Sequence, residues 1–339
     1  MAEQLTRIAA TQDWRLQLRD VITRPTELLS ILGLTPEQVA LSEGACDSFP
    51  LKVPRSFVAR MRARDPQDPL LLQVLSTQHE LRNPAGFSVD PVGEHTQAIP
   101  RAGIIHKYRG RVLLIVTGGC AVNCRYCFRR HFPYGDNQNS RSEWRAALDY
   151  IRADNSISEV ILSGGDPLVA GDEQLAELVG MIGDISQVQR LRIHSRLPIV
   201  IPERVTGTLL DAISHPRLSS VMVLHSNHAN ELDGAVGDAV AAMRSRGMTV
   251  LNQAVLLAGV NDTVDAQHAL SERLFALGVL PYYLHLLDRV AGAAHFDVAE
   301  AAAVQLHAAL SARLPGYLVP RLVREVAGAN AKVGILARG

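Results

Sequence analysis

Cys120-Ala-Val-Asn-Cys124-Arg-Tyr-Cys127 is the stretch that decides the fold and the chemistry of this chain of 339 residues. Three of the four cysteines lie within these eight residues, shortly after the apolar run Val112–Val116. The remaining cysteine, Cys46, lies far away in a Pro-rich region, and we interpret it as structural. Three crowded cysteines and a distant one make a poor disulfide framework and predict a metal site instead.

The spacing of the three cysteines favours an iron–sulfur cluster over zinc. A [4Fe–4S] cluster that is ligated by protein alone needs four cysteines, so three leave one iron open. The amino and carboxylate groups of S-adenosylmethionine (SAM) are suited to chelate that iron. Structural zinc usually has four ligands, and His131 is available as a fourth, so zinc remains an alternative. The CxxxCxxC spacing, with the aromatic Tyr126 before the last cysteine, is highly specific for the radical SAM superfamily, which this segment resembles.

An α/β fold is predicted by the sequence that surrounds the cysteines. After Arg101, short apolar runs alternate with longer amphipathic stretches, which indicates a parallel sheet covered by helices. Six such units are expected to form an open barrel or a doubly wound sheet. The predicted strands are Val112–Thr117, Glu159–Ser163, Leu191–His194, Val221–His225, Thr249–Ala254 and Leu280–His285. The predicted helices are Ser142–Ala153, Asp172–Ile182, Glu203–Ile213, Glu231–Arg246, Val264–Leu277 and Val298–Leu314.

Polar residues of chemical character follow five of the six predicted strands. Active sites of parallel barrels and sheets lie at the carboxyl ends of the strands, so five loops are expected to meet at one mouth. In addition to the cysteines, these residues are Gly164, Gly165 and Asp166, Ser195 and Arg196, His225, Asn227 and His228, and Asp288. In Ser163-Gly-Gly-Asp166 the paired glycines allow the backbone to approach a ligand closely, and exposed carbonyls would accept hydrogen bonds from the SAM ammonium.

Composition and charge limit the class of protein. Lys plus Arg and Asp plus Glu both number 34, and this balance predicts neither a nucleic-acid nor a membrane partner. The N-terminus has no apolar core of a secretory signal, and the best apolar run is only strand-length. We therefore expect a cytoplasmic protein in a reducing compartment. The expected organisation is a helical N-terminal region at 1–100, a barrel at 101–320 and a C-terminal segment at 321–339.

Several segments together resemble the lysine 2,3-aminomutases, a branch of the radical SAM enzymes, over about residues 80 to 332. The resemblance implies a partial (βα)6 radical SAM barrel with a helical N-terminal region and a short C-terminal segment that carries a lysine for pyridoxal phosphate (PLP). The matching segments are His106–Leu114, Cys127–Phe132, Ser163–Pro167, Arg192–Arg196, Asn252–Leu256, Gly259–Asp262 and Pro281–Tyr283, which leads to Asp288 and His295-Phe296.

The resemblance also implies cofactor-binding residues. PLP is expected as a second cofactor, and a PLP enzyme needs a lysine that binds it covalently. The chain has few lysines, and Lys332, in a small-residue stretch, matches the family's PLP lysine and is the expected catalytic residue. Residues that match those around the PLP phosphate are Lys107, Tyr108 and Arg111, and residues that match SAM contacts are Ser163, Gly164, Gly165, Asp166, His225 and Gln253.

Two charged ends of a substrate site follow from the same resemblance. Arg129 matches the arginine that binds the substrate carboxylate, and Asp288 matches a carboxylate that receives the substrate ε-ammonium. Glu325 stands where the family's larger enzymes carry a second aspartate, seven residues before the PLP lysine. An arginine at one end and an aspartate at the other predict L-lysine as the substrate.

Within this family, the chain is most similar to the elongation factor P (EF-P) (R)-β-lysylation proteins. The resemblance implies that L-α-lysine is converted to (R)-β-lysine, which a separate lysine ligase attaches to EF-P, with electrons from a low-potential donor such as flavodoxin. No structural zinc is expected, since Thr263 stands where longer enzymes have a cysteine. The alternatives are a radical SAM aminomutase acting on another amino acid, a radical SAM enzyme without PLP, and a non-catalytic iron–sulfur or zinc module.

Overall fold

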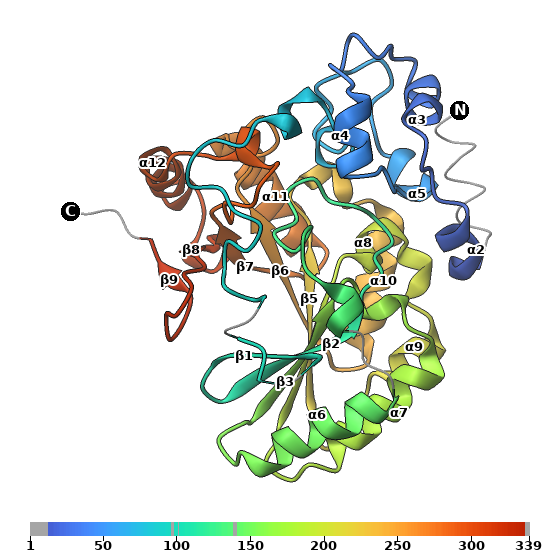
Figure 1. Ribbon diagram of the computed structural model, residues 1–339, viewed down its shortest axis with the longest axis vertical. Coiled ribbons are helices and arrows are strands. Elements are labelled where there is room, and N and C mark those ends of the chain that lie inside the picture. Colours follow the sequence, from blue (N-terminus) through green and yellow to red (C-terminus); the bar gives the residue numbers. More distant parts are fainter. Residues whose placement is uncertain (1–12, 96–97, 101, 138–140, 336–339) are drawn as a thin grey trace.

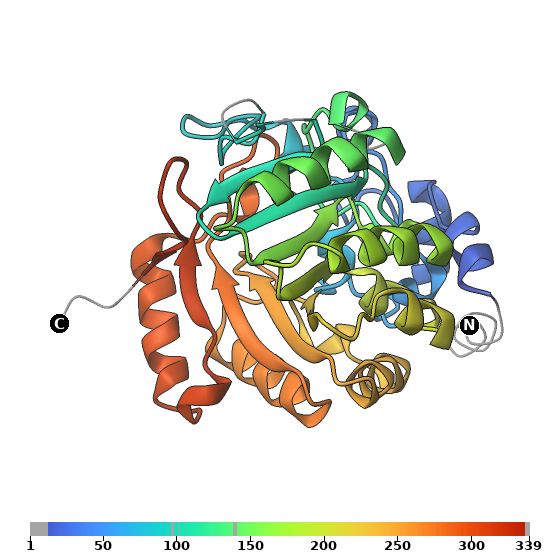
Figure 2. The same cartoon turned by 90° about the horizontal axis from the view of Figure 1, so that it is seen from below.

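The computed structural model describes residues 13–95, 98–100, 102–137 and 141–335, and in this part of the chain it has one nine-stranded sheet (Figure 1). The strands follow one another in the sheet in the order of the sequence, and β2 to β8 are parallel. β1 and β9 are antiparallel strands at the two edges. Figure 2 shows the sheet curved into an open barrel with helices on its outer face. The predicted α/β class and partial barrel are confirmed.

The six predicted strands are all present, each within two residues of its predicted ends. They are β2 (Arg111–Thr117), β3 (Glu159–Gly164), β4 (Arg190–Ser195), β5 (Ser219–His225), β6 (Thr249–Val255) and β7 (Leu280–His285). The strands β1 (Ile104–Tyr108), β8 (Arg321–Arg324) and β9 (Val333–Gly334) were not predicted. They are short and lie at or near the sheet edges, where a continuous apolar run is not required.

Every barrel helix given below except α8 was predicted, with ends that differ from the predicted ones by at most four residues, whereas α8 was not predicted. The barrel helices are α6 (Arg141–Ala153), α7 (Asp172–Gly183), α8 (Leu197–Val200), α9 (Gly207–Ala212), α10 (Gly234–Ser245), α11 (Val264–Ala276) and α12 (Glu300–Ser311). The predicted helix Glu203–Ile213 was wrong at its start, because Thr206 caps α9 by accepting a hydrogen bond from Leu209 N at 3.1 Å. Asp233 caps α10 in the same way, with 3.0 Å to Val236 N.

The N-terminal region is a set of short helices that covers the end of the barrel where the cysteine loop lies (Figure 1). It includes α2 (Trp14–Arg19), α3 (Pro25–Leu32), α4 (Glu43–Ser48) and α5 (Arg55–Val58). Ser56 Oγ donates to Val200 O at 2.6 Å, and Arg60 Nη2 donates to Ile199 O at 2.6 Å. Among the described residues, no helix has the length and apolar character needed to cross a membrane.

Two consecutive glycines bring the end of β3 against the end of β2. Gly165 N donates to Thr117 O at 2.7 Å, and Asp166 N donates to Gly119 O at 2.8 Å. Gly164 has a φ of +120°, and a Cβ on Gly165 would overlap the backbone of Gly119. The glycines are therefore required for contact between two backbone segments, and this contact fixes where the cysteine loop begins.

We expect Gly165→Ala to destabilise the protein by about 1–3 kcal/mol and to lower the iron bound after anaerobic reconstitution, because the added Cβ pushes the cysteine loop away. Urea unfolding and iron analysis measure the two effects. The control is Gly180→Ala, a glycine inside α7 whose added Cβ meets no atom within 4 Å. There the same substitution should stabilise by about 0.5–1 kcal/mol through helix propensity, and equal losses in both variants would contradict the argument.

Candidate active site

The cysteine loop is held at both of its faces. Cys127 N donates to Cys124 O at 2.9 Å in a tight turn. On the side of the N-terminal region, Asn123 N donates to Lys52 O at 2.9 Å and Arg125 N donates to Gln73 O at 3.0 Å. On the barrel side, Cys124 Sγ accepts a hydrogen bond from Arg196 Nη1 at 2.8 Å. These contacts fix the loop between the strand ends and the N-terminal region.

The three thiols of the loop influence one another electrostatically. Burial raises the pKa of Cys127 to about 11, and the charge of Cys124 adds to the effect. Burial also raises the pKa of Cys120 well above its usual value, with contributions from the other two cysteines. Such thiols become thiolates when a metal ion binds them.

The donor set of the cysteine loop suits a cubane. A tetrahedral zinc site requires four ligands that converge on one ion, whereas the three cysteines of a cubane each bind a different iron. Three thiols on one short loop therefore fit a [4Fe–4S] cluster with one open iron. Among the described residues, no group of three or more His, Cys, Asp or Glu side chains is placed to hold a single metal ion.

The Gly-Gly-Asp loop, predicted to contact SAM, makes many internal contacts. The buried Asp166 carboxylate accepts hydrogen bonds from Ser195 Oγ at 2.7 Å, Arg196 N at 2.8 Å and Leu197 N at 2.9 Å. Gly164 O accepts a hydrogen bond from Tyr134 OH at 2.7 Å. Asp166 thus joins the end of β3 to the start of α8, and its predicted contact with SAM stays a prediction.

Two half-buried histidines, His194 and His225, lie on the neighbouring strands β4 and β5. His225, predicted to contact SAM, is the register partner of Gln253, the other predicted contact from a neighbouring strand. Burial and the charge of Arg196 lower the pKa of His225 to about 3, so its imidazole is neutral. The Nε2 atoms of His225 and His194 are buried without a hydrogen-bond partner in the described part of the chain. Unpaired buried nitrogen atoms of this kind fit a site that a polar ligand fills.

A row of alternating charges crosses the site, and we call it the charge chain: Arg129, Glu94, Lys107, Glu325 and Lys332. Arg129 Nε donates to Glu94 Oε2 at 2.7 Å, and Lys107 Nζ lies 3.0 Å from Glu94 Oε1. Lys107 Nζ also donates to Glu325 Oε1 at 3.3 Å, and Lys332 Nζ donates to Glu325 Oε2 at 2.6 Å. The charge chain connects Arg129, the predicted substrate-binding arginine, with Lys332, the predicted PLP lysine.

Glu325 and Lys332 meet because the last two strands close the sheet. Glu325 directly follows β8 and Lys332 directly precedes β9, and these strands pair in antiparallel fashion. Burial acts to raise the pKa of Glu325, but Lys332 and Lys107 outweigh it and hold the pKa at about 2. Tyr108 OH also donates a hydrogen bond to Glu325. The carboxylate is therefore ionised and serves as a fixed anion between two lysines.

Asp288 belongs to the same site. It is half-buried in the loop after β7, and burial raises its pKa to about 7 although the charge of Lys332 opposes this. Glu325 and Glu94 also raise this pKa, which places Asp288 within electrostatic reach of the charge chain. A carboxyl group that titrates near neutrality is typical of functional sites.

Arg111 and the tyrosines Tyr108, Tyr282 and Tyr283 belong to the strands near Lys107 and Lys332. The Arg111 guanidinium lies 4.7 Å from the ring centroid of Tyr108, its register partner. Arg111 has no ion-pair partner within the ranges that the structure describes. The ring centroids of Tyr282 and Tyr283 lie 3.8 Å apart with their planes tilted by 35°, and Lys332 Nζ lies 5.8 Å from the centroid of the Tyr283 ring. An unpaired cation, two lysines and aromatic faces fit a phosphorylated, planar cofactor such as PLP.

Sequence reasoning missed Glu94, Gln73 and His194 as site residues. Glu94 lies near the end of the predicted helical N-terminal region, and a turn places its side chain in the interior. In that turn the Asp90 carboxylate accepts hydrogen bonds from Glu94 N at 2.8 Å and His95 N at 3.0 Å, with Gly93 at a φ of +69°. Asp-Pro followed by Gly was a recognisable turn signal, but it did not reveal which side chain would point inward.

An open α/β barrel with three cysteines on the loop after its first parallel strand defines an iron–sulfur enzyme of the radical SAM class. A family model described as the radical SAM superfamily matches residues 114–205, which include the end of β2, the cysteine loop and the Gly-Gly-Asp loop.

Comparison with sequence relatives identifies the family within the radical SAM superfamily to which the chain belongs. It is 49% identical over 322 residues to the L-lysine 2,3-aminomutase of Escherichia coli (strain K12), covering 95% of this chain and 94% of the relative. It is 47% identical to that of Haemophilus influenzae, covering 95% of both chains. It is 33% identical to that of Clostridium subterminale, covering 96% of this chain and 78% of the relative. The chain belongs to the L-lysine 2,3-aminomutase family and is an isomerase of the radical SAM superfamily, a membership that implies a [4Fe–4S] cluster, SAM and PLP.

Replacing Glu94, the anion of the charge chain between Arg129 and Lys107, should lower the stability of the protein. We expect Glu94→Gln to destabilise the protein by about 3–5 kcal/mol, because Arg129 remains buried without a counter-charge and Lys107 keeps only Glu325. Burial acts to raise the pKa of Glu94, but Arg129 and Lys107 hold it below its usual value of 4.5. The difference in free energy of unfolding should therefore be full above that pH and shrink on acidification.

Glu300→Gln is the matched control, since Glu300 pairs with Arg324 at 2.8 Å on the surface, with side chains 52% and 36% exposed. Its cost should stay within about 1 kcal/mol, measured by denaturant unfolding. A Glu94 variant as stable as this control would show that the buried cations need no partner.

Proposed function

We propose that this enzyme is an L-lysine 2,3-aminomutase that converts L-α-lysine to (R)-β-lysine with PLP as its second cofactor. The observation that carries the proposal is the charge chain, which joins Arg129 beside the cysteine loop to Lys332, with Asp288 within electrostatic reach of Lys332 and Glu325. The names of the relatives support the same reaction. L-Lysine has one carboxylate and two amino groups, which an arginine, a PLP lysine and a carboxylate can each recognise.

The cofactors supply the difficult chemistry when they are bound: the reduced cluster and SAM provide a carbon radical that abstracts hydrogen, and PLP provides a conjugated system for amino migration. The protein holds these groups and excludes water from the site. Cys120, Cys124 and Cys127 bind the cluster, and His225 with Gln253 faces SAM in this proposal. The Gly-Gly-Asp loop keeps the cysteine loop in register with the ends of the strands.

Lys332 is the lysine that we assign to PLP. Of the three lysines, Lys52 lies in the N-terminal region and Lys107 is shared between two carboxylates. Lys332 pairs only with Glu325 among the described carboxylates and lies beside the Tyr283 ring.

The two ends of the substrate are bound by opposite charges. Arg129 uses its Nε and Nη2 edge for Glu94, while Nη1 donates to Ser163 Oγ at 3.2 Å. A substrate carboxylate would bind the outer edge formed by Nη1 and Nη2. Asp288 and Glu325 would receive the ε-ammonium group. Holding both ends positions the β-carbon for hydrogen abstraction and keeps the radical from reacting elsewhere.

A role in translation is the finer part of the proposal. We propose that (R)-β-lysine from this enzyme is attached to EF-P by a separate ligase, in a reducing cytoplasm that also supplies a low-potential donor such as flavodoxin. The support is the match over 94–95% of the relatives from Escherichia coli and Haemophilus influenzae, against 78% of the one from Clostridium subterminale.

The test is anaerobic incubation of reconstituted enzyme with L-lysine, SAM, PLP and dithionite, followed by chiral chromatography for β-lysine. We expect product from the native enzyme, and neither bound cluster nor product from Cys124→Ala. Lys332→Ala should keep its iron and its SAM cleavage but lose β-lysine formation. If L-lysine gives no β-lysine while glutamate or another amino acid gives its β-isomer, the alternative aminomutase is correct.

The rate should depend on pH through Asp288. Because burial raises the pKa of this carboxyl group to about 7, the anion that receives the ε-ammonium group forms only as the pH rises through that value. We expect kcat/KM for L-lysine to increase across this range. Asp288→Asn should remove that ionisation and raise KM roughly 10- to 100-fold above neutrality.

Asp297→Asn serves as the control, because Asp297 lies nine residues further along and pairs with the exposed Arg289 at 3.1 Å. Steady-state kinetics at several pH values should give this variant the same dependence of kcat/KM on pH as the native enzyme. The same rise of kcat/KM in Asp288→Asn would assign the ionisation to another group.

A further inference from the structure

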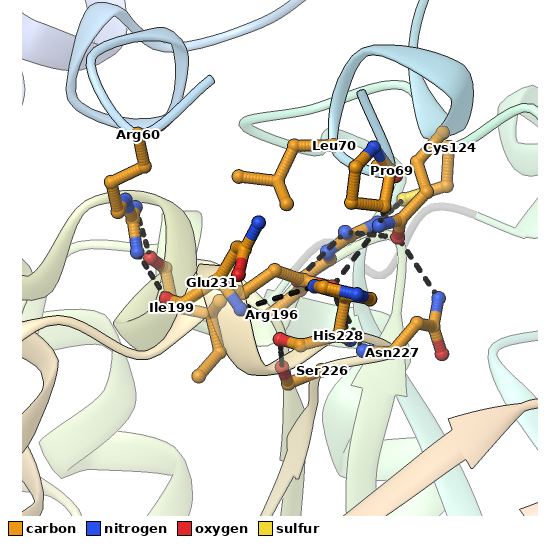
Figure 3. Close-up of polar contacts among 12 residues, drawn as sticks. Arg60, Pro69, Leu70, Cys124, Arg196, Ile199, Ser226, Asn227, His228 and Glu231 are labelled. Carbon is orange, nitrogen blue, oxygen red and sulfur yellow. Dashed lines mark hydrogen bonds and ion pairs between the residues drawn. The ribbon is translucent and has the colours of Figure 1, made fainter. Parts of the chain in front are cut away.

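Arg196 lies between the cysteine loop and the N-terminal region, and its side chain is only 6% exposed (Figure 3). It directly follows β4, and its guanidinium reaches two of the motif residues. Nη1 donates to Cys124 Sγ at 2.8 Å and also to Tyr126 OH. Nη2 donates to Gln73 Oε1 at 2.8 Å and to Glu231 Oε2 at 3.0 Å. The guanidinium therefore has one end on a predicted cluster ligand and the other on two fixed acceptors.

The two acceptors are themselves held firmly. Glu231 has no exposed side-chain surface, and its Oε1 accepts hydrogen bonds from Gln73 Nε2 at 3.1 Å and Asn227 N at 2.9 Å. Gln73 Nε2 also donates to Pro69 O at 2.9 Å. The backbone of Arg196 is fixed separately, because Arg196 N donates to Asp166 Oδ2 at 2.8 Å. This arrangement leaves the guanidinium one orientation, with Nη1 toward Cys124.

A guanidinium in this place acts on the cluster by charge and by hydrogen bonding. It stays protonated at every working pH, so its positive charge is permanent. One-electron reduction makes an iron–sulfur cluster more negative, and both a cation and a hydrogen bond to a ligating sulfur favour the more negative state. The surroundings are buried, where such interactions are weakly screened.

We propose that Arg196 is a positioning residue that raises the reduction potential of the cluster by donating to Cys124 Sγ, with Gln73 and Glu231 holding it in place. This inference rests on the cluster assigned in the proposed function. It goes further by naming the residue that adjusts how readily the cluster accepts the electron used to cleave SAM. The electron comes from the low-potential donor and resides on the cluster, so no other reactant is required.

The test measures the potential directly. Native enzyme, Arg196→Met and Arg196→Lys are reconstituted anaerobically without SAM, their iron and sulfide are counted, and the reduced cluster is followed by electron paramagnetic resonance during redox titration. We expect Arg196→Met to retain its iron and to lower the equilibrium constant for reduction about tenfold, which corresponds to about 59 mV for one electron. Arg196→Lys keeps the charge beside Glu231 and should show a smaller shift of the same sign.

Arg204→Met is the matched control. Arg204 is fully buried, pairs with Asp172 at 2.7 Å, and donates to Leu168 O at 2.7 Å and Ala170 O at 3.0 Å rather than to a cysteine. Its loss should reduce stability without changing the potential.

The possible failures are distinguishable. Native enzyme without four irons would overturn the proposed function and this inference together. A full cluster with an unchanged potential in both Arg196 variants overturns the inference alone. A raised KM for SAM at an unchanged potential would assign Arg196 to SAM instead. If Arg196→Met does not hold a cluster, the potential of Arg196→Lys decides.

Discussion

Pairing of buried positive charge is the constraint on which the rest of this site depends. Three buried arginines surround the cysteine motif, and an unpaired charge in such a place costs several kcal/mol. Each arginine has a partner from the residues that precede the barrel. Arg125 pairs with Glu80, Arg129 pairs with Glu94, and Arg196 donates to Gln73. The segment from Gln73 to Glu94 is therefore part of the active site rather than a separate cover.

This pairing explains how the barrel end is closed. The strand ends of an open barrel expose backbone groups and polar side chains, which need partners once water is excluded. The cysteine loop obtains them from the N-terminal region, with Asn123 N on Lys52 O and Arg125 N on Gln73 O. At the opposite edge of the sheet, β8 and β9 bring Glu325 and Lys332 to the same interior. Two segments far apart in sequence thus complete a site whose centre is the barrel.

Much of the fold was predictable because its signals are local. Six strands were found from continuous apolar runs, and the starts of α9 and α10 differ from the predicted ones because the caps Thr206 and Asp233 decide the first turn. The cysteines were recognisable by spacing alone. Glu94 was not, because its partners Arg129 and Lys107 are 35 and 13 residues away and no periodic pattern indicates a single inward carboxylate. Tertiary contacts, rather than propensity, determine which polar residues become buried.

The charge chain also indicates how the site is prepared for a charged substrate. Its three cations and two anions, with Asp288 titrating near neutrality, leave little net charge in the interior. The lysine end of the charge chain carries Glu325 and lies within electrostatic reach of Asp288, whereas the other end is Arg129 beside the cysteine loop. In the proposed reaction, a molecule with an ammonium group at one end and a carboxylate at the other would find a counter-charge for both of its ends. An uncharged side chain would leave the carboxyl groups at the lysine end without an incoming cation.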